Sequence, residues 1–515
     1  MEENTESRMT RRGFVGAMGA MGSVLMAVNA VQFASGEESV DTSGCETNEA
    51  RTPSPVDCRN RTEAVVASNQ GSMPKPWAPR SDYPGETAKN PNVVPLISAP
   101  APSVLTPEEV DELINNEITV TEDYVKADGT VVPAAYINMR NKVNRNGIGI
   151  GSKLTTDDHW DVWEYLATEH EAECYSEMPQ YVDFTAADYA LKSGRDEQSC
   201  VEVCDALARK GLLHCVHRGG NSFYHTQTSE YGLYEARATR LTKEYLDKKD
   251  AGDGEGSSFV DSGTSMYRTF PVDLSVVKGE HTPFDDWHAI LDRNDTFSVS
   301  PCVCRTRNII AEKIDHLDCD HPVETCLCTG EHAKYMIEYG DAREITREEA
   351  ESILQNAVDQ GMLLESVYTR NAENICCCHA DCCLNVGAVR KLNGGPSIET
   401  YSNFYLAHDT DICIKCGACA ARCPMFSITM DEQTGYPIVD SACLRCGQCA
   451  TVCPVDARWL VLKPQEDRPY IPHDLIEDYE CKARVRAAKG LLYDYRGQSV
   501  EKSTADASSS SHEGR

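Results

Sequence analysis

Cys-Ile-Lys-Cys-Gly-Ala-Cys-Ala-Ala-Arg-Cys-Pro at residues 413–424 and Cys-Leu-Arg-Cys-Gly-Gln-Cys-Ala-Thr-Val-Cys-Pro at residues 443–454 are the stretches that decide the fold of this chain. Each run has the spacing C-x-x-C-x-x-C-x-x-x-C-P. Three thiolates three positions apart wrap one side of a cubane cluster, and the fourth cysteine lies too far along the chain to ligate the same cluster. Zinc ribbons use pairs of C-x-x-C rather than runs of four cysteines ending in proline, so the spacing favours iron–sulfur ligation.

Over about residues 405–463 the sequence resembles the bacterial ferredoxins that carry two [4Fe–4S] clusters. The resemblance implies a C-terminal ferredoxin domain with a βαββαβ-like order of elements, which we place at residues 401–465. It also implies that each cluster takes three cysteines from one run and the last cysteine of the other. The expected ligands are Cys413, Cys416, Cys419 and Cys453 for the first cluster, and Cys443, Cys446, Cys449 and Cys423 for the second.

The composition limits the other functions that the chain can have. Its 515 residues are enough for several domains, at roughly 100–200 residues each. It has 49 basic and 81 acidic residues and a net charge of −32, which repels nucleic acid, so we expect no nucleic-acid partner. Many of the 25 cysteines lie two or three positions apart, which favours metal or cluster ligation over disulfides.

The N-terminus has the pattern of an export signal. Thr10-Arg11-Arg12-Gly13-Phe14 precedes an apolar stretch rich in Gly, Ala and Met, which resembles a twin-arginine (Tat) signal at residues 1–34. The alternative is a membrane anchor, but so many glycines and alanines make the stretch only weakly hydrophobic. We therefore expect a periplasmic or cell-envelope protein, exported by the Tat pathway, whose only membrane contact is an uncleaved signal. Residues 35–104 are expected to be a disordered linker.

Residues 105–245 are expected to form a helical, winged-helix-like domain. Helices are predicted near Trp160, from Thr185, and from Gln198 to Lys210, followed by a hairpin around residues 219–221. With the acidic charge and the export signal, this unit is expected to contact proteins rather than DNA. Its helical cysteines, Cys200 and Cys204, are expected in the core. A linker is expected at residues 246–264.

A second cysteine field lies in residues 265–400, for which we expect a cysteine-rich helical module. Ten cysteines flank an amphipathic helix predicted at 346–364, with a capping box at Thr346 and Glu349, so the chain is expected to fold back and bring them together. Three alternatives remain open: a third iron–sulfur cluster, a structural zinc, or disulfides formed after export. The candidate ligands are Cys302, Cys304, Cys319, Cys326, Cys376, Cys378, Cys382 and Cys383.

The motifs C-x-C-R at 302–305 and E-T-C-L at 324–327, ahead of a two-cluster ferredoxin segment, are similar to a group of bacterial and archaeal 4Fe–4S-binding proteins. The resemblance covers about residues 157–463, and members of the group also have a winged-helix-like segment upstream. This chain differs from the group in its Tat signal, in Cys328 and Cys377, and in His379, where many members have a cysteine. The resemblance implies metal binding and no particular activity.

Together these patterns predict an α+β multidomain protein, with a C-terminal helix and a disordered tail in residues 466–515. The expected function is an exported electron-transfer relay or subunit that serves an extracytoplasmic oxidoreductase and contacts a redox partner protein. No catalytic residue is identified. The alternatives are a cytoplasmic redox-sensing winged-helix regulator and a reductase with a catalytic cluster in the second cysteine field.

Overall fold

The computed structural model describes most of the chain from residue 119 to residue 488, in seven segments. These are 119–145, 157–227, 233–253, 265–311, 321–391, 400–468 and 470–488. The predicted signal, the linker at 35–104, Cys319 and the C-terminal tail lie outside the described residues. The linker predicted at 246–264 starts too early, because α9 (Lys243–Asp253) runs through its first residues.

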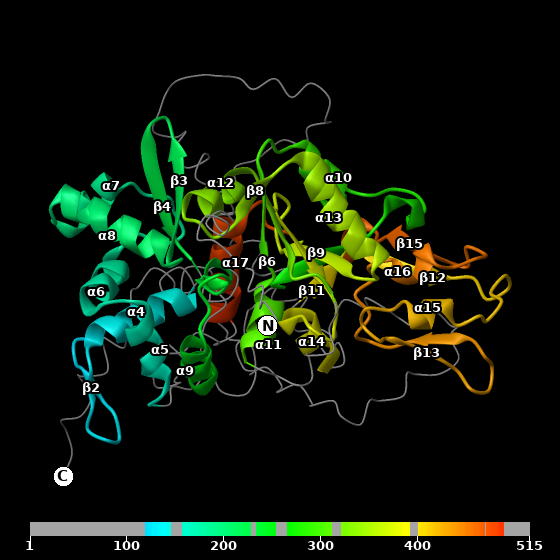
Figure 1. Cartoon of the computed structure of the whole chain (residues 1–515), viewed down its shortest axis with the longest axis horizontal. Helices are drawn as coiled ribbons and strands as arrows, with labels where there is room; N and C mark the ends of the chain where they lie inside the picture. The colour runs from blue at the N-terminus through cyan, green and yellow to red at the C-terminus, as the bar shows by residue number, and fades with distance from the viewer. Residues whose placement is uncertain are drawn as a thin grey trace, which may run out of the picture.

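The first unit is mainly helical and lies at the left of Figure 1. Its elements are β1 (Tyr124–Val125), β2 (Val131–Val132), α4 (Ala134–Arg145), α5 (His159–Leu166), α6 (Glu169–Glu177), α7 (Ala186–Ser193), α8 (Glu197–Arg209), β3 (Leu213–Arg218), β4 (Asn221–Thr226), η3 (Glu235–Arg237) and α9. The predicted helices and hairpin are present in the predicted order. The likeness to a winged helix itself stays a prediction.

Local capping explains where these helices begin and end. Thr168 forms a capping box with Glu171 at the start of α6, and Thr185 forms one with Asp188 at the start of α7. The turn between β3 and β4 has two glycines at positive φ, as a tight hairpin turn requires. Cys200 and Cys204 are both fully buried in the core of this unit, as expected.

The second unit contains a sheet of seven strands in the described part of the chain, in the order β11-β5-β9-β10-β7-β6-β8. The strands are β5 (Tyr267–Phe270), β6 (Phe297–Pro301), β7 (Glu324–Thr329), β8 (Arg343–Ile345), β9 (Leu363–Val367), β10 (Asn374–Cys378) and β11 (Thr400–Ser402). Neighbours are antiparallel except for β11 and β5. The expectation of a helical module was therefore incomplete. Strands such as β10 are rich in cysteine, which hid their alternation, because cysteine packs as a small apolar residue.

Helices and short 3-10 turns surround this sheet. They are η4 (Leu274–Val276), η5 (Pro283–Asp285), α10 (Trp287–Asp292), α11 (Val303–Ile310), α12 (Gly330–Glu338), α13 (Arg347–Asp359) and α14 (Leu384–Lys391). The helix predicted at 346–364 is α13, and it ends earlier because β9 begins at Leu363. Thr346 caps its first turn, as predicted. The carboxylate of Glu349, however, lies 2.5 Å from the Arg343 guanidinium.

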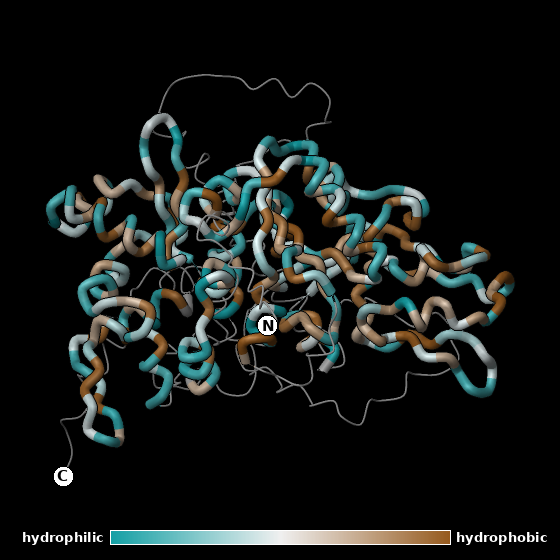
Figure 2. The backbone as a smooth tube through the Cα atoms, in the orientation of Figure 1, coloured by the Kyte–Doolittle hydropathy of each residue, from teal (hydrophilic) through white to brown (hydrophobic). Residues whose placement is uncertain are grey.

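One apolar core joins the sheet to the C-terminal domain. Leu354 of α13 packs in the same cluster as Leu327 and Leu364 of the sheet and as Val439 and Leu460 of the domain that follows. Figure 2 shows apolar stretches running through the centre of the molecule and polar ones on the outer helices. The apolar core therefore extends across the domain boundary predicted near residue 400.

The C-terminal domain has the element order βαββαβ, at the right of Figure 1. Its elements are β12 (Phe404–His408), α15 (Ala418–Ala421), β13 (Ile428–Met430), β14 (Pro437–Val439), α16 (Gln448–Thr451) and β15 (Arg458–Leu462). β12 pairs with β15 and β13 pairs with β14, both antiparallel. The backbone N–H of Val272 donates to the carbonyl of Cys446 at 2.9 Å, which fixes this domain to the central unit.

The last described elements are η7 (Gln465–Asp467) and α17 (Leu475–Ala488), and α17 contacts both of the first two units. Ile476 packs on Val216 of the hairpin, and Tyr479 shares a cluster with Tyr267 and Val367 of the sheet. Across the described residues, the helices are too short or too polar to cross a bilayer.

A buried ion pair offers a test of this arrangement. The Arg268 guanidinium lies 2.7 Å from a carboxylate oxygen of Asp285, both side chains are 1% exposed, and Asn403 donates to the other carboxylate oxygen at 2.8 Å. Asp285→Ala leaves a buried cation unpaired, so we expect it to lower the free energy of unfolding by about 3–5 kcal/mol in urea titrations.

The matched control is Glu324→Ala, which removes an exposed ion pair with Arg343 at 2.9 Å. It is expected to cost no more than about 1 kcal/mol. Equal losses in the two variants would contradict the arrangement described for Asp285.

Candidate functional site

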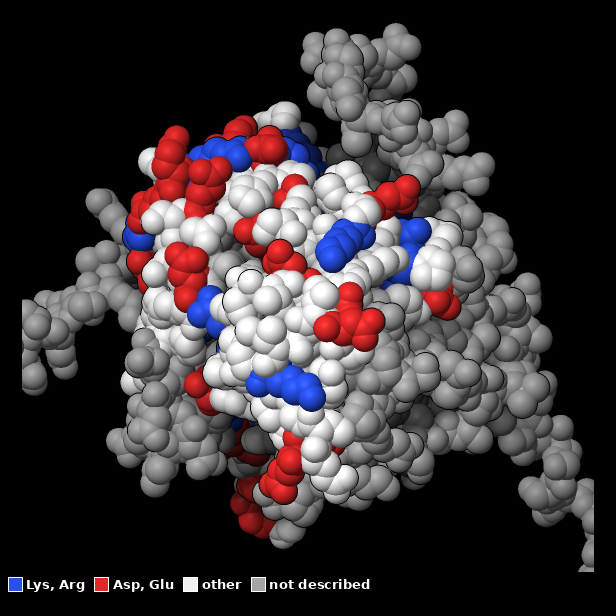
Figure 3. Space-filling model, turned by 90° about the vertical axis from the view of Figure 1, so that its right-hand side faces the viewer, with Lys and Arg blue, Asp and Glu red and all other residues white. Residues whose placement is uncertain are grey.

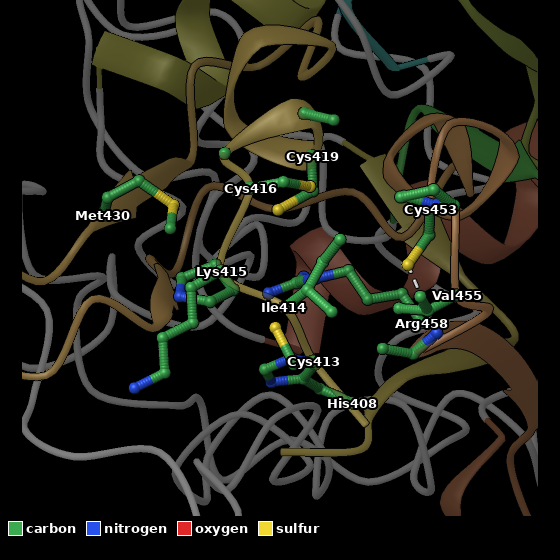
Figure 4. Close-up of a pocket in the computed structure, with 15 residues that line it drawn as sticks. His408, Cys413, Ile414, Lys415, Cys416, Cys419, Met430, Cys453, Val455 and Arg458 are labelled. Carbon is green, nitrogen blue, oxygen red and sulfur yellow. Dashed lines mark hydrogen bonds between the residues drawn. The ribbon is translucent and has the colours of Figure 1, made fainter. Parts of the chain in front are cut away.

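The four cysteines predicted for the first cluster line one pocket. Cys413 and Cys416 lie in the loop before α15, Cys419 lies on α15, and Cys453 follows α16 from the other run. Figure 4 shows their sulfur atoms around the pocket, with Ile414 and Arg458 nearby. The structure thus brings three cysteines of one run together with the last cysteine of the other.

The four cysteines predicted for the second cluster are close enough to influence each other's ionisation. Burial, followed by the charges of Cys423, Cys449 and Cys443, raises the pKa of Cys446. Burial raises the pKa of Cys423 to about 11 and that of Cys449 to about 12. Thiolates at these positions need the positive charge of a bound metal to be stable at neutral pH.

The backbone repeats the same unusual conformation in both runs. Lys415 and Arg445 have φ of 59° and 55°, and Phe426 and Asp456 have φ of 50° and 51°. Such residues cost about 1–3 kcal/mol each and persist only where the surroundings impose them. Left-handed residues turn successive N–H groups toward one side, which creates an anion-binding concavity. Each such residue recurs thirty positions later, so the two halves are related by a pseudo-two-fold repeat.

Backbone N–H groups also point at sulfur in both halves. The N–H of Ser427 donates to the Sγ of Cys423 at 3.3 Å, and the N–H of Ala457 donates to the Sγ of Cys453 at 3.2 Å. Hydrogen bonds of this kind stabilise the negative charge of cluster ligands. The pocket lined by the first set, the repeated loops and these N–H···S bonds all fit iron–sulfur clusters.

The two sets of cysteines differ in exposure. Cys416 is exposed, and Cys413, Cys419 and Cys453 are half-buried. All four cysteines of the second set are buried in the shared core. The first set therefore faces the surface, and the second faces the central unit.

The second cysteine field forms a continuous row of neighbouring thiols in the described residues, each close enough to shift the pKa of the next. Its seven sulfur atoms come from two helix starts and two strands. Their order is Cys302, Cys304, Cys383, Cys378, Cys376, Cys326 and Cys328. We call this set the thiol string. No disulfide bond joins any two of the described cysteines.

Strand geometry explains how the thiol string forms. Residues two apart on a strand point to the same face, which aligns Cys326 with Cys328 on β7 and Cys376 with Cys378 on β10. The paired register of β10 and β7 places Cys376 beside Cys326. Cys377 lies between its neighbours on β10 and therefore points to the opposite face.

Polar groups complete the surroundings of the thiol string. The Sγ of Cys378 donates to the buried carboxylate of Glu365 at 3.1 Å, and the ligand atoms of Glu365, Cys378 and Cys383 lie within 4.8 Å of one another. The neighbouring thiols of Cys304 and then Cys378 lower the pKa of Cys383. The shift favours the thiolate, which is the form that binds metal.

A buried arginine balances this negative charge. Arg305 donates to the hydroxyl of Thr325 at 2.9 Å and to the carbonyl of Cys377 at 2.8 Å. Burial lowers the pKa of Arg305, but the thiolate charges nearby, Cys302 first, more than offset it and raise the pKa overall. A fixed cation of this kind suits a site of several thiolates.

Not all predicted residues join the thiol string. Cys302, Cys304, Cys326, Cys376, Cys378 and Cys383 do, whereas the Sγ of Cys382 donates to the carbonyl of His379 at 3.8 Å. Cys328 joins without having been predicted. Its position two residues after Cys326 would have indicated this if residues 324–329 had been recognised as a strand.

The thiol string lies against the second ferredoxin set. The N–H of Ala380, three residues before Cys383, donates to the carbonyl of Pro424 at 2.9 Å, and Pro424 follows Cys423. Phe426 contacts the His379 ring edge-on, with centroids 5.2 Å apart. The two cysteine fields are thus neighbours in the fold.

Residues 412–457 match the family described as 4Fe-4S dicluster domain, and the match includes all eight cysteines of the two runs. The chain therefore carries a 4Fe–4S domain of the ferredoxin type and binds iron–sulfur cofactors. Such a domain, in a chain with so many other cysteines, indicates iron–sulfur electron transfer. Comparison with curated proteins and with solved structures gives no match.

The repeated loops allow a matched pair of glycine substitutions. Gly417 and Gly447 have φ of 77° and 90°, so alanine is strained at both. A Cβ at 447 would lie 2.8 Å from the Cγ2 of Val276, whereas at 417 the nearest atom is the Cγ of Met430 at 4.0 Å. We expect Gly447→Ala to cost about 1–3 kcal/mol more than Gly417→Ala in free energy of unfolding, because of overpacking.

The second measurement is the rate at which iron is lost to a chelator, followed by visible absorbance. It should rise more in Gly447→Ala than in Gly417→Ala. The reverse order would contradict the contact between α16 and the central unit.

Proposed function

We propose that this protein is an exported electron carrier, a relay or subunit serving an extracytoplasmic oxidoreductase. It would hold two [4Fe–4S] clusters in the ferredoxin domain and a third iron–sulfur cluster on the thiol string. The observation that carries the proposal is the gradient of burial from Cys416 at the surface, through the buried second set, to the adjacent thiol string. When bound, each cluster would supply one-electron chemistry.

The exposed half of the ferredoxin domain is the part that would meet a redox partner. Ile414 is 59% exposed and Ile412 is 46% exposed, on either side of Cys413. Figure 3 views the molecule from the side on which this domain lies, and shows isolated charges among uncharged residues there. A small apolar surface next to a ligand loop suits brief contacts between electron-transfer proteins.

The number of sulfur atoms favours a multinuclear cluster over a single metal on the thiol string. A structural zinc takes four ligands and closes its site. The string offers seven thiols with a buried arginine beside them, more than a zinc ion can use. A structural zinc and disulfides formed after export remain the alternatives.

A second candidate function is a reductase whose thiol string is catalytic. Glu365 favours it, because a buried carboxylate that accepts from the Sγ of Cys378 at 3.1 Å could hold a proton beside a cluster. The cytoplasmic regulator has no such support, since a net charge of −32 opposes DNA binding.

Cys383→Ser tests the third cluster, with Cys377→Ser as its matched control on the opposite face of β10. In anaerobically purified protein we expect about twelve irons and twelve sulfides per chain, falling to about eight of each in Cys383→Ser and unchanged in Cys377→Ser. Loss of about one zinc instead of iron in Cys383→Ser would assign a structural zinc. Equal metal contents in all three proteins would contradict any metal on the thiol string.

The export signal is tested by Arg11→Lys together with Arg12→Lys. Because twin-arginine export depends on the arginine pair, the doubly substituted protein is expected to accumulate in the cytoplasm with its clusters intact. Fractionation and immunoblotting would measure this, with Arg51→Lys, beyond the predicted signal, as the control. A parent protein confined to the cytoplasm would contradict export.

A further inference from the structure

A second potential metal site lies beside the thiol string and contains no sulfur ligand. His321 lies just before β7, and His379 and Asp381 lie in the loop after β10. The ligand atoms of these three residues are within 4.8 Å of one another. The Nδ1 of His379 is 2.8 Å from a carboxylate oxygen of Asp381, and the two imidazole rings have centroids 4.7 Å apart.

We propose that His321, His379 and Asp381 bind one divalent first-row transition-metal ion. Two imidazoles and one carboxylate form the ligand set that holds a mononuclear ion on one side and leaves its remaining positions for water or another ligand. Nitrogen and oxygen donors distinguish this ion from the iron that thiolates would bind. The site stands on its own residues and does not depend on a third cluster.

The loop that carries two of the ligands is held in place from several directions. The Ala380 N–H is bonded to Pro424, and Phe426 packs edge-on against the His379 ring. The Cys382 backbone N–H donates to the carbonyl of His379 at 3.2 Å, which closes the loop around Asp381. Such supporting contacts orient ligands before the metal arrives, and they commonly accompany metal sites.

Partial burial also suits metal binding. The side chains of His379 and Asp381 are 14% and 34% exposed, so water can reach the site while part of each ligand is shielded. A surface pair elsewhere shows the contrast. The Nδ1 of His288 lies 3.2 Å from a carboxylate oxygen of Asp286, but this histidine is 51% exposed, and no third ligand joins the pair among the described residues.

The position of the site gives the ion a role in the relay. His379 contacts Phe426, close to Cys423 of the second ferredoxin set, and Asp381 lies two residues before Cys383 of the thiol string. A divalent cation here would lie between the two cysteine fields. Its charge would act on both of them, because charges in a partly buried environment interact over several ångströms.

The experiment uses Mn²⁺ as the probe on full-length, cluster-loaded protein kept anaerobic and oxidised. Oxidised [4Fe–4S] clusters are silent in EPR, and Mn²⁺ prefers nitrogen and oxygen ligands over thiolates. We expect one saturable Mn²⁺ per chain with spin-echo modulation from imidazole nitrogen. His321→Ala and Asp381→Asn should each weaken binding more than about 100-fold, since even outer partners of a ligand contribute about 10–100-fold. His288→Ala should leave binding unchanged.

Iron and sulfide contents and circular dichroism of each variant would show that it is folded and loaded. Absence of saturable binding, absence of nitrogen modulation, or equal binding in all three variants would overturn the site. None of these outcomes changes the iron and sulfide counts on which the proposed electron carrier depends, so the two proposals fail separately.

Discussion

The pairing of β10 with β7 determines where the sulfur atoms of the central unit lie. Because successive residues of a strand point to opposite faces, a slip of one position would move Cys376 and Cys378 onto the apolar face that packs against α13. In the observed register, polar and thiol side chains of six neighbouring strands line up in one row across the sheet. That row is Ser300, Cys326, Cys376, Glu365, Thr269 and Ser402. One sheet thus has an apolar face that builds the core and a polar face that gathers thiols.

The same division explains how the ferredoxin domain is attached. The apolar core that packs against α13 contains both Leu327 of the sheet and Leu460 of the ferredoxin domain, so the domain and the sheet share one core. The Asp285 carboxylate adds a polar connection, since it receives hydrogen bonds from Arg268 of β5 and Asn403 beside β12. The buried cysteine set is consequently surrounded by protein on the side of the thiol string, and the other set is left at the surface.

The sequence predicted those features that depend on short spacing. Three features were recognisable: the two cysteine runs, the capping residue Thr346 and the glycine turn after β3. Each is defined by residues that are only a few positions apart in the sequence. The sheet, the place of Cys328 in the thiol string and the grouping of His321 with His379 were not. Each depends on strands that are far apart in the chain, and no spacing rule connects residue 321 with residue 379. Cysteine also conceals strand alternation, since it fits either face.

The thirty-residue repeat within the ferredoxin domain allows the effect of ligand spacing on reduction potential to be distinguished from the effect of the surroundings. Both halves present the same ligand spacing, the same left-handed backbone positions and the same N–H···S bond, at Ser427 and at Ala457. The two halves differ in side chains between the cysteines, such as Ala418 against Gln448, and in their surroundings, since Cys416 is exposed whereas Val276 packs near Gly447. Because solvent exposure is one of the factors that set such potentials, clusters bound in the two halves would differ in potential even with the same ligand spacing. The burial that the central unit imposes on one half would therefore bias the direction in which electrons move between them.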